Sequence, residues 1–274
     1  MRKLKPWHEL TFQDDYMFKL VMSQKPCCQA VLELILRIPI RDIRYIEDEK
    51  SIRPLYGSKG IRLDVYVADA NNTVFDVEMQ VKSLGGAILP KRSRYYQSTI
   101  DVERLLSGVE YDELSNTYVI FICPFALFDG QRHIYTFTNI CREDKNLELG
   151  DGTTKIFLST KGKLNDVPEN VKAFLNYVDG IKSADPLVQS IDTLIKDIKE
   201  REGEMRNYMD YSLKFQDAMR DEYKKGHKEG LNQGRLTTLV ENIRNFAKTG
   251  LSFEEVMDIL QVPTAERPAV LAAL

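Results

Sequence analysis

Apolar and polar residues alternate strictly in two neighbouring segments, residues 61–67 and 74–81. An alternation with a period of two predicts β-strands, because successive side chains of a strand point to opposite faces. The intervening residues 70–73 read Ala-Asn-Asn-Thr, and Asn favours turns because it tolerates left-handed backbone angles. The pattern therefore predicts a β-hairpin whose two strands each have one apolar and one polar face.

Candidate chemistry lies on the polar faces of this hairpin. Asp64 lies on the polar face of the first strand, and Glu78 and Gln80 lie on that of the second. Antiparallel pairing would bring Asp64 and Glu78 to one spot. Two carboxylates and an amide are oxygen ligands of the kind that Mg²⁺ takes, with positions left for water and phosphate. The alternative interpretation is a hairpin whose solvent face is acidic.

Apolar periodicity also predicts the elements around the hairpin. Helical spacing predicts four helices, at residues 11–23, 26–38, 89–106 and 168–178. Short apolar or alternating runs predict four further strands, at residues 40–46, 117–125, 132–139 and 154–159, with residues 51–60 as a loop. The strand at 117–125 is almost wholly apolar, which is typical of a strand covered on both faces. Together these elements predict an α/β core with one central mixed sheet flanked by helices.

The composition changes at residues 183–186, and the chain beyond reads as all-α. We expect a core domain at residues 1–182, a long helix at 183–235 and a small helical tail at 236–274. Apolar residues between Leu187 and Tyr208 recur every three or four positions, a narrow stripe that predicts a partner helix. We prefer a homodimer through this helix to a partner within the chain.

Three glycines, Gly226, Gly230 and Gly234, follow at intervals of four. They suggest a closely packed helix face, and a flexible linker is the alternative. For the tail we favour an oligomerisation or accessory role.

Composition excludes some classes of function. The 274 residues are 43% hydrophobic and carry a net charge of −3, so the chain has no basic tail, and DNA contacts would have to come from local patches. The four cysteines show no zinc-ligand spacing, and we expect them to be reduced. No apolar run approaches about twenty residues and the N-terminus lacks a signal-peptide core, so we expect a cytoplasmic protein with no membrane partner.

The densest basic and aromatic cluster follows the hairpin directly. Arg92 and Arg94 are candidates for phosphate contact, with Tyr95 or Tyr96 packing near the site. Lys82 could add positive charge if the strand continues, although a solvated strand end is the simpler interpretation. The alternative for the cluster is a solvated helix start with core tyrosines.

The order Asp64, thirteen residues, Glu78-x-Gln80 resembles the PD-(D/E)xK motif, in the form used by the Rpn family of recombination-promoting nucleases, also labelled as transposases. The resemblance implies that Asp64 and Glu78 hold the metal. Leu63 stands where Pro is usual, which has little chemical weight. Gln80 stands where Lys is usual, and this exchange removes a cation that could orient water or neutralise charge on phosphate.

The segment TFQDDYMFKLVMSQ, residues 11–24, also resembles the start of that family, where a D-x-x-F-K pattern recurs. In the wider superfamily an acidic residue of the first helix often joins the metal site. Asp14 or Asp15 is the candidate here, and stabilisation of a helix start is the alternative role for either.

The resemblance implies a metal-dependent DNA endonuclease associated with recombination or mobile elements, using Mg²⁺ or Mn²⁺. Asp64 and Glu78 would hold the ion, and Gln80 would place the attacking water. The alternative is a catalytically silent interaction or DNA-binding protein that keeps the nuclease fold.

Overall fold

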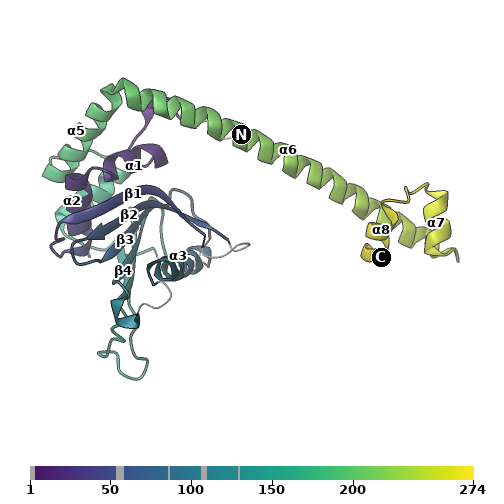
Figure 1. Ribbon diagram of the computed structural model, residues 1–274, viewed down its shortest axis with the longest axis horizontal. Helices are drawn as coiled ribbons and strands as arrows, with labels where there is room; N and C mark the ends of the chain where they lie inside the picture. Colours follow the sequence, from purple (N-terminus) through teal and green to yellow (C-terminus); the bar gives the residue numbers. More distant parts are fainter. Residues whose placement is uncertain (1–3, 54–58, 86, 106–109, 129) are drawn as a thin grey trace. The chain divides into compact units, whose positions relative to one another are not determined.

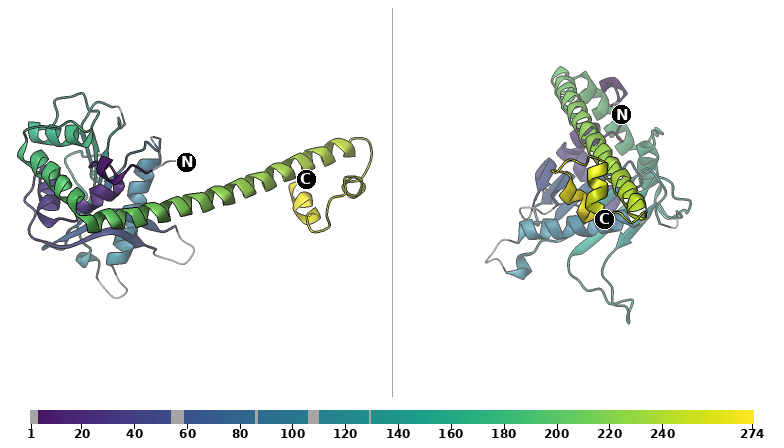
Figure 2. Two further views of the ribbon diagram at one scale, coloured as in Figure 1. Left: turned by 90° about the horizontal axis from the view of Figure 1, so that it is seen from above. Right: turned by 90° about the vertical axis from the view of Figure 1, so that its right-hand side faces the viewer.

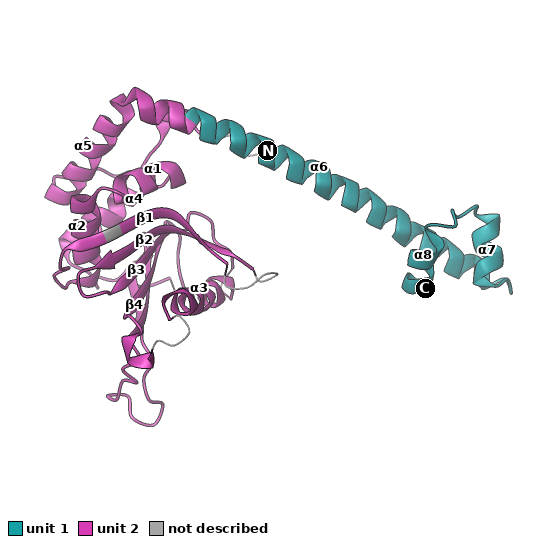
Figure 3. Ribbon diagram, in the orientation of Figure 1, with its two compact units in different colours: residues 1–4, 209–274 teal, residues 5–208 magenta. Residues whose placement is uncertain are grey.

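The computed structural model describes residues 4–53, 59–85, 87–105, 110–128 and 130–274. The chain divides into two compact units (Figure 3), one formed by residues 5–208 and the other by Leu4 with residues 209–274. The domain limits predicted at residues 182 and 235 stay predictions. No helix in the described ranges is long and apolar enough to cross a membrane.

The larger unit is built on a mixed sheet, as predicted. The described residues form six strands in the order β1-β2-β3-β4-β6-β5. The strands are β1 (Ile43–Ile52), β2 (Ile61–Asp69), β3 (Val74–Met79), β4 (Thr117–Cys123), β5 (Ile134–Phe137) and β6 (Thr153–Ser159). β1, β2 and β3 are antiparallel, β3, β4 and β6 are parallel, and β5 pairs antiparallel with β6 at the edge. The predicted hairpin is therefore the β2-β3 pair.

Helices cover both faces of this sheet. They are α1 (Asp15–Met22), α2 (Lys25–Leu36), α3 (Ile88–Arg104), α4 (Glu169–Val178) and α5 (Pro186–Glu200), with short 3₁₀ turns at Trp7–Glu9 and Tyr111–Glu113. α3 lies on the opposite side of the sheet from α1 and α2 (Figures 1 and 2). β4 lies between two parallel neighbours with helices on either side, which explains why it is apolar throughout and almost wholly buried.

The long helix predicted at residues 183–235 is two helices. α5 ends at Glu200, Arg201 is extended with φ −79° and ψ 106°, and α6 (Glu202–Ala247) then begins. The sequence held a weak signal of this break, because Arg201 interrupts the apolar stripe and Gly203 follows two residues later. The buried side chains of α5 face the rest of the larger unit, where the helix packs on α1, α2 and α4: Val188, Ile191, Ile195 and Ile198. Tyr208 is buried too, so the predicted stripe from Leu187 to Tyr208 is largely covered within the chain and is not the face for a second copy.

Two other boundaries differ from the prediction. α1 begins at Asp15 with Asp14 as its N-cap, later than the predicted start at residue 11. β1 begins at Ile43 and continues to Ile52, into the predicted loop, because an edge strand accommodates the charged residues 47–50. The rest of that loop lies partly outside the described residues, as does residue 106, the predicted end of the helix that corresponds to α3.

The smaller unit has a core of its own. α7 (Phe253–Ile259) and α8 (Arg267–Ala273) pack on the end of α6 around a buried apolar cluster: Val240, Ile243, Val256, Met257, Val262 and Val270. Ser252 and Glu255 form a capping box at the start of α7. Gly250 has φ +97°, the left-handed geometry expected of a glycine after a helix end.

Candidate active site

The site forms where β2 and β3 part. Their pairing register ends at Val65 and Val77, whereas β3 remains paired with β4 as far as Met79. Beyond that point, hydrogen bonds from two carboxylate side chains take the place of backbone pairing between the strands. Glu78 Oε1 accepts a hydrogen bond from the backbone N of Asp64 at 2.8 Å, and Asp64 Oδ2 accepts one from the backbone N of Met79 at 3.1 Å. The two acidic side chains predicted to converge therefore lie together and are held by reciprocal hydrogen bonds to the backbone. We call this pair, Asp64 and Glu78, the fork.

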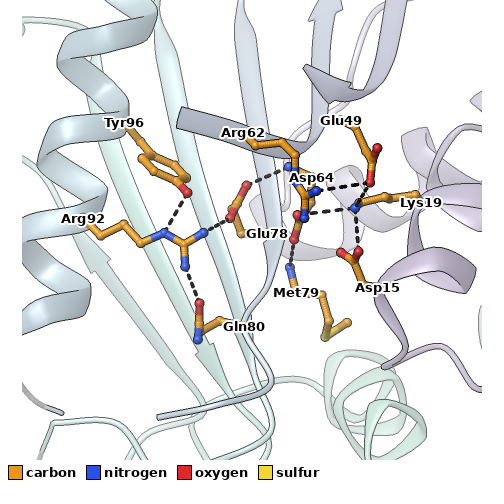
Figure 4. A network of polar contacts seen from close by, with 10 residues as sticks. All are labelled: Asp15, Lys19, Glu49, Arg62, Asp64, Glu78, Met79, Gln80, Arg92 and Tyr96. Carbon is orange, nitrogen blue, oxygen red and sulfur yellow. Dashed lines mark hydrogen bonds and ion pairs between the residues drawn. The ribbon is translucent and has the colours of Figure 1, made fainter. Parts of the chain in front are cut away.

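Arg92, from the first turns of α3, reaches this fork from one side (Figure 4). Its Nη2 lies 2.7 Å from Glu78 Oε2, its Nη1 donates to Gln80 Oε1 at 2.5 Å, and its Nε donates to the Tyr96 hydroxyl at 2.8 Å. Gln80 also donates through Nε2 to the carbonyl of Lys82. One guanidinium thus holds three of the residues singled out in the sequence.

Lys19, from α1, approaches the fork from the other side in Figure 4. Its Nζ lies 2.7 Å from Asp15 Oδ2, 2.7 Å from Glu49 Oε1 and 4.0 Å from Asp64 Oδ1. Only 3% of Lys19 is exposed. Although burial alone would lower the pKa of Lys19, the surrounding carboxylates, Asp15 first, raise it, so the amine is a fixed cation.

Sequence reasoning assigned no role to Lys19 or Glu49. The available signal for Lys19 was a lysine one turn after Asp15 on a helix that is otherwise mostly apolar. Glu49 gave none, because the strand that carries it extends further than the alternation indicated. It has φ +56°, so the backbone of β1 departs from extended geometry at this residue.

Other predicted site residues lie apart from the fork. Asp14 is the N-cap of α1 and lies before its first turn. Its carboxylate accepts hydrogen bonds from Lys5 Nζ and the backbone N of Thr11, each at 2.8 Å. Arg94 is exposed, and Lys82, also exposed, contributes only its carbonyl to the hydrogen bond with Gln80. Of the two N-terminal acids, only Asp15 therefore reaches the cluster, and it does so through Lys19.

A third carboxylate, Asp76, was also overlooked. It is fully buried at 0% exposure, and neither of its oxygens has a hydrogen-bond partner. Burial and the neighbouring Glu78 raise its pKa well above the ordinary value, and both therefore favour the neutral acid form. The alternation puts Asp76 on the same polar face as Glu78, and α3, which carries Arg92, lies against that face.

Burial dominates the electrostatics of the two fork carboxylates. It raises the pKa of Asp64 to about 6, with Asp15 adding to the rise and Lys19 opposing it. It raises the pKa of Glu78 to about 8, with Asp64 adding to the rise and Arg92 opposing it. Anions that are costly to hold in a low-dielectric site favour a bound cation.

The donor set fits a divalent ion that keeps part of its hydration shell. Within the described ranges, no three or more acidic, His or Cys side chains form a closed set of metal ligands. Mg²⁺ does not require one, since it is commonly held by one or two carboxylates together with waters and substrate phosphate. Asp64 and Glu78, hydrogen-bonded to each other's strands, provide such a pair.

Comparison with known proteins decides the family. The family model described as PD-(D/E)XK nuclease family transposase matches residues 12–232, which include the whole cluster described above. The chain belongs to this family. The resemblance inferred from Asp64, Glu78 and Gln80 is thereby confirmed. Neither the curated proteins nor the solved structures that were compared contained a match.

PD-(D/E)XK nucleases generally use divalent metal ions. Positive charge reaches the fork from two flanking helices. Arg92 of α3 contacts Glu78, and Lys19 of α1 lies beside Asp64.

Proposed function

We propose that this chain is a metal-dependent DNA endonuclease that hydrolyses phosphodiester bonds, with Asp64 and Glu78 holding Mg²⁺ or Mn²⁺. One observation supports this proposal above the others. The two carboxylates occupy the point where β2 and β3 part, each bonded to the backbone of the other's strand, so their positions are fixed before any ligand binds. Preorganised carboxylates of this kind are what a hydrolytic metal site requires.

The bound ion would supply Lewis-acid charge and a water of lowered pKa. Side chains of the protein orient the carboxylates and supply further positive charge. Arg92 orients Glu78 and offers a cation toward phosphate, whereas the buried Lys19 supplies fixed positive charge beside Asp64. Gln80 was expected to place the attacking water. Because both ends of its amide bind protein atoms, we propose that it mainly positions Arg92.

Substitution of the carboxylates tests this function. Asp64→Asn and Glu78→Gln keep the shape of each side chain and remove the charge, so we expect both variants to lose at least about a hundredfold in cleavage of plasmid DNA with Mg²⁺ or Mn²⁺. Glu148→Gln, an exposed acid outside the cluster, is the matched control. Calorimetric titration with Mg²⁺ should show binding by the control and loss of binding by the two site variants. Undiminished cleavage by both site variants would contradict the assignment.

The alternative function, a catalytically silent DNA-binding or interaction protein, has one observation in its favour. Glu78 already uses both oxygens, one toward the backbone of Asp64 and one toward Arg92. If the wild-type chain binds DNA but does not cleave it with either metal, while the Arg92 contact persists, this alternative holds.

We also propose that α6 pairs two copies of the chain, which act in the cytoplasm on DNA of mobile elements. Several large apolar side chains of α6 beyond Tyr208 are exposed: Met209, Leu213, Met219, Tyr223 and Leu231. At about 100° per residue they fall within roughly a third of the helix circumference. A second copy would cover this stripe and bring two sites to the two strands of a duplex.

A further inference from the structure

A groove of about 670 Å³ opens beside the fork, between the start of β2 and the first turns of α3. Asp64 and Arg92 line its inner end, so the groove continues directly from the proposed metal site. Its volume falls within the range of small-ligand sites. Its outer part is lined by residues to which neither the motif nor the proposed chemistry assigns a role.

The groove carries more positive than negative charge, although the chain as a whole does not. Lys59, Arg62, Lys91 and Arg92 line it, and Asp64 is the one acid among the described lining residues. Arg62 and Arg92 also pair with Glu49 and Glu78, so the excess comes mainly from Lys59 and Lys91, which are exposed. Against a net charge of −3 for the chain, this local excess of positive charge favours a polyanion such as the backbone of nucleic acid.

The same groove carries an exposed apolar wall. Leu84 is 37% exposed, Ile88 54% and Tyr95 37%. The Tyr95 hydroxyl donates to the carbonyl of Lys59 across the groove, which fixes the orientation of the ring. A paired duplex would not cover this apolar wall, because its bases are stacked inside the duplex and only phosphates and sugars would face the groove. The wall would then stay exposed to water. An unpaired base offers an apolar face of the right kind, and base stacking on an aromatic ring is a recurrent device of single-strand binding.

We propose that this groove binds the base of an unpaired nucleotide adjacent to the cleaved phosphate, so that the chain acts on single-stranded or locally unpaired DNA. The wall formed by Leu84, Ile88 and Tyr95 receives the base, and the surrounding cations receive the phosphates. This inference names the substrate class of the proposed nuclease and rests on that function only for the cleavage step.

The test measures binding by the full-length chain in EDTA, by fluorescence anisotropy. The probes are one short DNA strand, its perfect duplex, a duplex with a one-nucleotide bulge, and the single strand with a central abasic site. We expect the single strand and the bulged duplex to bind at least about tenfold more tightly than the perfect duplex. The abasic strand should lose most of this advantage, since it keeps the phosphates and lacks the base.

Variants assign the effect to the wall. Tyr95→Ala should weaken binding of the single strand by about tenfold and of the perfect duplex by less than about twofold, because only the unpaired base stacks on the ring. Tyr95→Phe keeps the ring and loses only the hydroxyl bond to Lys59, so it should keep most of the preference for the single strand. Tyr111→Ala removes a tyrosine that is 84% exposed and outside the groove, and should change neither affinity. If Tyr95→Ala does not fold by circular dichroism, Ile88→Ser at the exposed rim replaces it with the same expected selectivity.

Equal affinity for the single strand and the perfect duplex would overturn the inference, as would equal weakening of both by the wall variants. Cleavage assays with Mg²⁺ distinguish failure of the groove assignment from failure of the proposed endonuclease function. Selective binding without cleavage would leave the groove assignment standing and reject the endonuclease. Cleavage of perfect duplex and single strand at equal rates would reject the groove assignment alone.

Discussion

Arg92 Nη2 lies 2.7 Å from Glu78 Oε2, and this contact joins helix α3 to the central strand β3. The carboxylate is 1% exposed and the guanidinium side chain 28% exposed, so the pair spans the boundary between core and groove. The Arg92 guanidinium also lies over two aromatic rings, with its Cζ 4.7 Å from the ring centroid of Tyr96 and 5.5 Å from that of Phe121. A cation so placed both stabilises a buried anion and faces the proposed path of the substrate.

Replacement of Arg92 should affect activity and stability together. Arg92→Met keeps much of the side-chain volume but leaves Glu78 without its ion pair, so we expect cleavage to fall at least about tenfold and the free energy of unfolding to fall by about 2 kcal/mol. Arg92→Lys should recover part of the stability but little of the geometry, because it cannot contact Glu78, Gln80 and Tyr96 at once. Urea unfolding and plasmid cleavage give the two readouts. Arg142→Met, at an exposed arginine, is the control.

Lys19 offers a separate test of the cations that flank the fork. Lys19→Met should reduce cleavage at least about tenfold while the variant still binds DNA, because Asp15, Glu49 and Asp64 would lose their shared counter-ion next to the proposed metal ligands. Lys25→Met, one helix later and exposed, is the control. Full activity in Lys19→Met would assign the lysine to the fold alone.

The pKa shifts predict how stability depends on pH. Glu78, whose pKa rises to about 8 from 4.5, and Asp64, which rises to about 6 from 3.8, hold protons more tightly in the folded than in the unfolded state. Their contribution to stability is therefore largest at acid pH and is lost as the pH rises from about 4 to 8. Glu78→Gln should flatten this part of the melting-temperature profile of the metal-free protein. In the wild type, added Mg²⁺ should raise the melting temperature most near pH 8, where ion binding displaces the fewest protons.

Truncation separates the roles of the two C-terminal helices. A chain ending at residue 208 keeps α5 and should fold, with its melting temperature close to that of the parent, whereas one ending at residue 185 exposes the core residues that α5 covers and should aggregate. Light scattering should show a dimer for the full chain and a monomer for residues 1–208. The chain of residues 1–208 should keep nicking activity and lose double-strand cleavage. A monomeric full chain would contradict the proposed pairing through α6.

The sequence was most informative where local periodicity reflects burial. The alternation around Asp64 and Glu78 predicted both strands, their turn and the convergence of the two carboxylates, because one face of each strand is apolar and the other carries the polar cluster. The almost wholly apolar β4 was equally clear. These are short-range signals, and each is contained within one element.

What the sequence did not show depends on contacts between distant elements. Lys19 meets Glu49 and Asp64 only after α1, β1 and β2 have packed, and no spacing along the chain records that meeting. Asp76 is polar by pattern, yet it is fully buried, because α3 lies against the face that it shares with Glu78.

The N-terminal segment has a consequence for how the chain is made. Trp7 Nε1 donates to the carbonyl of Lys199 at 2.9 Å, and the Tyr208 hydroxyl donates to the carbonyl of Lys5 at 2.6 Å. These bonds join residues about 190 to 200 positions apart, near the longest separation possible within this unit. Contacts of such range form late, because the chain entropy lost in closing the loop precedes any gain. During synthesis, Lys5 and Trp7 are therefore made long before Tyr208 and Lys199, their partners in the folded chain, so this segment cannot dock until synthesis has passed α5.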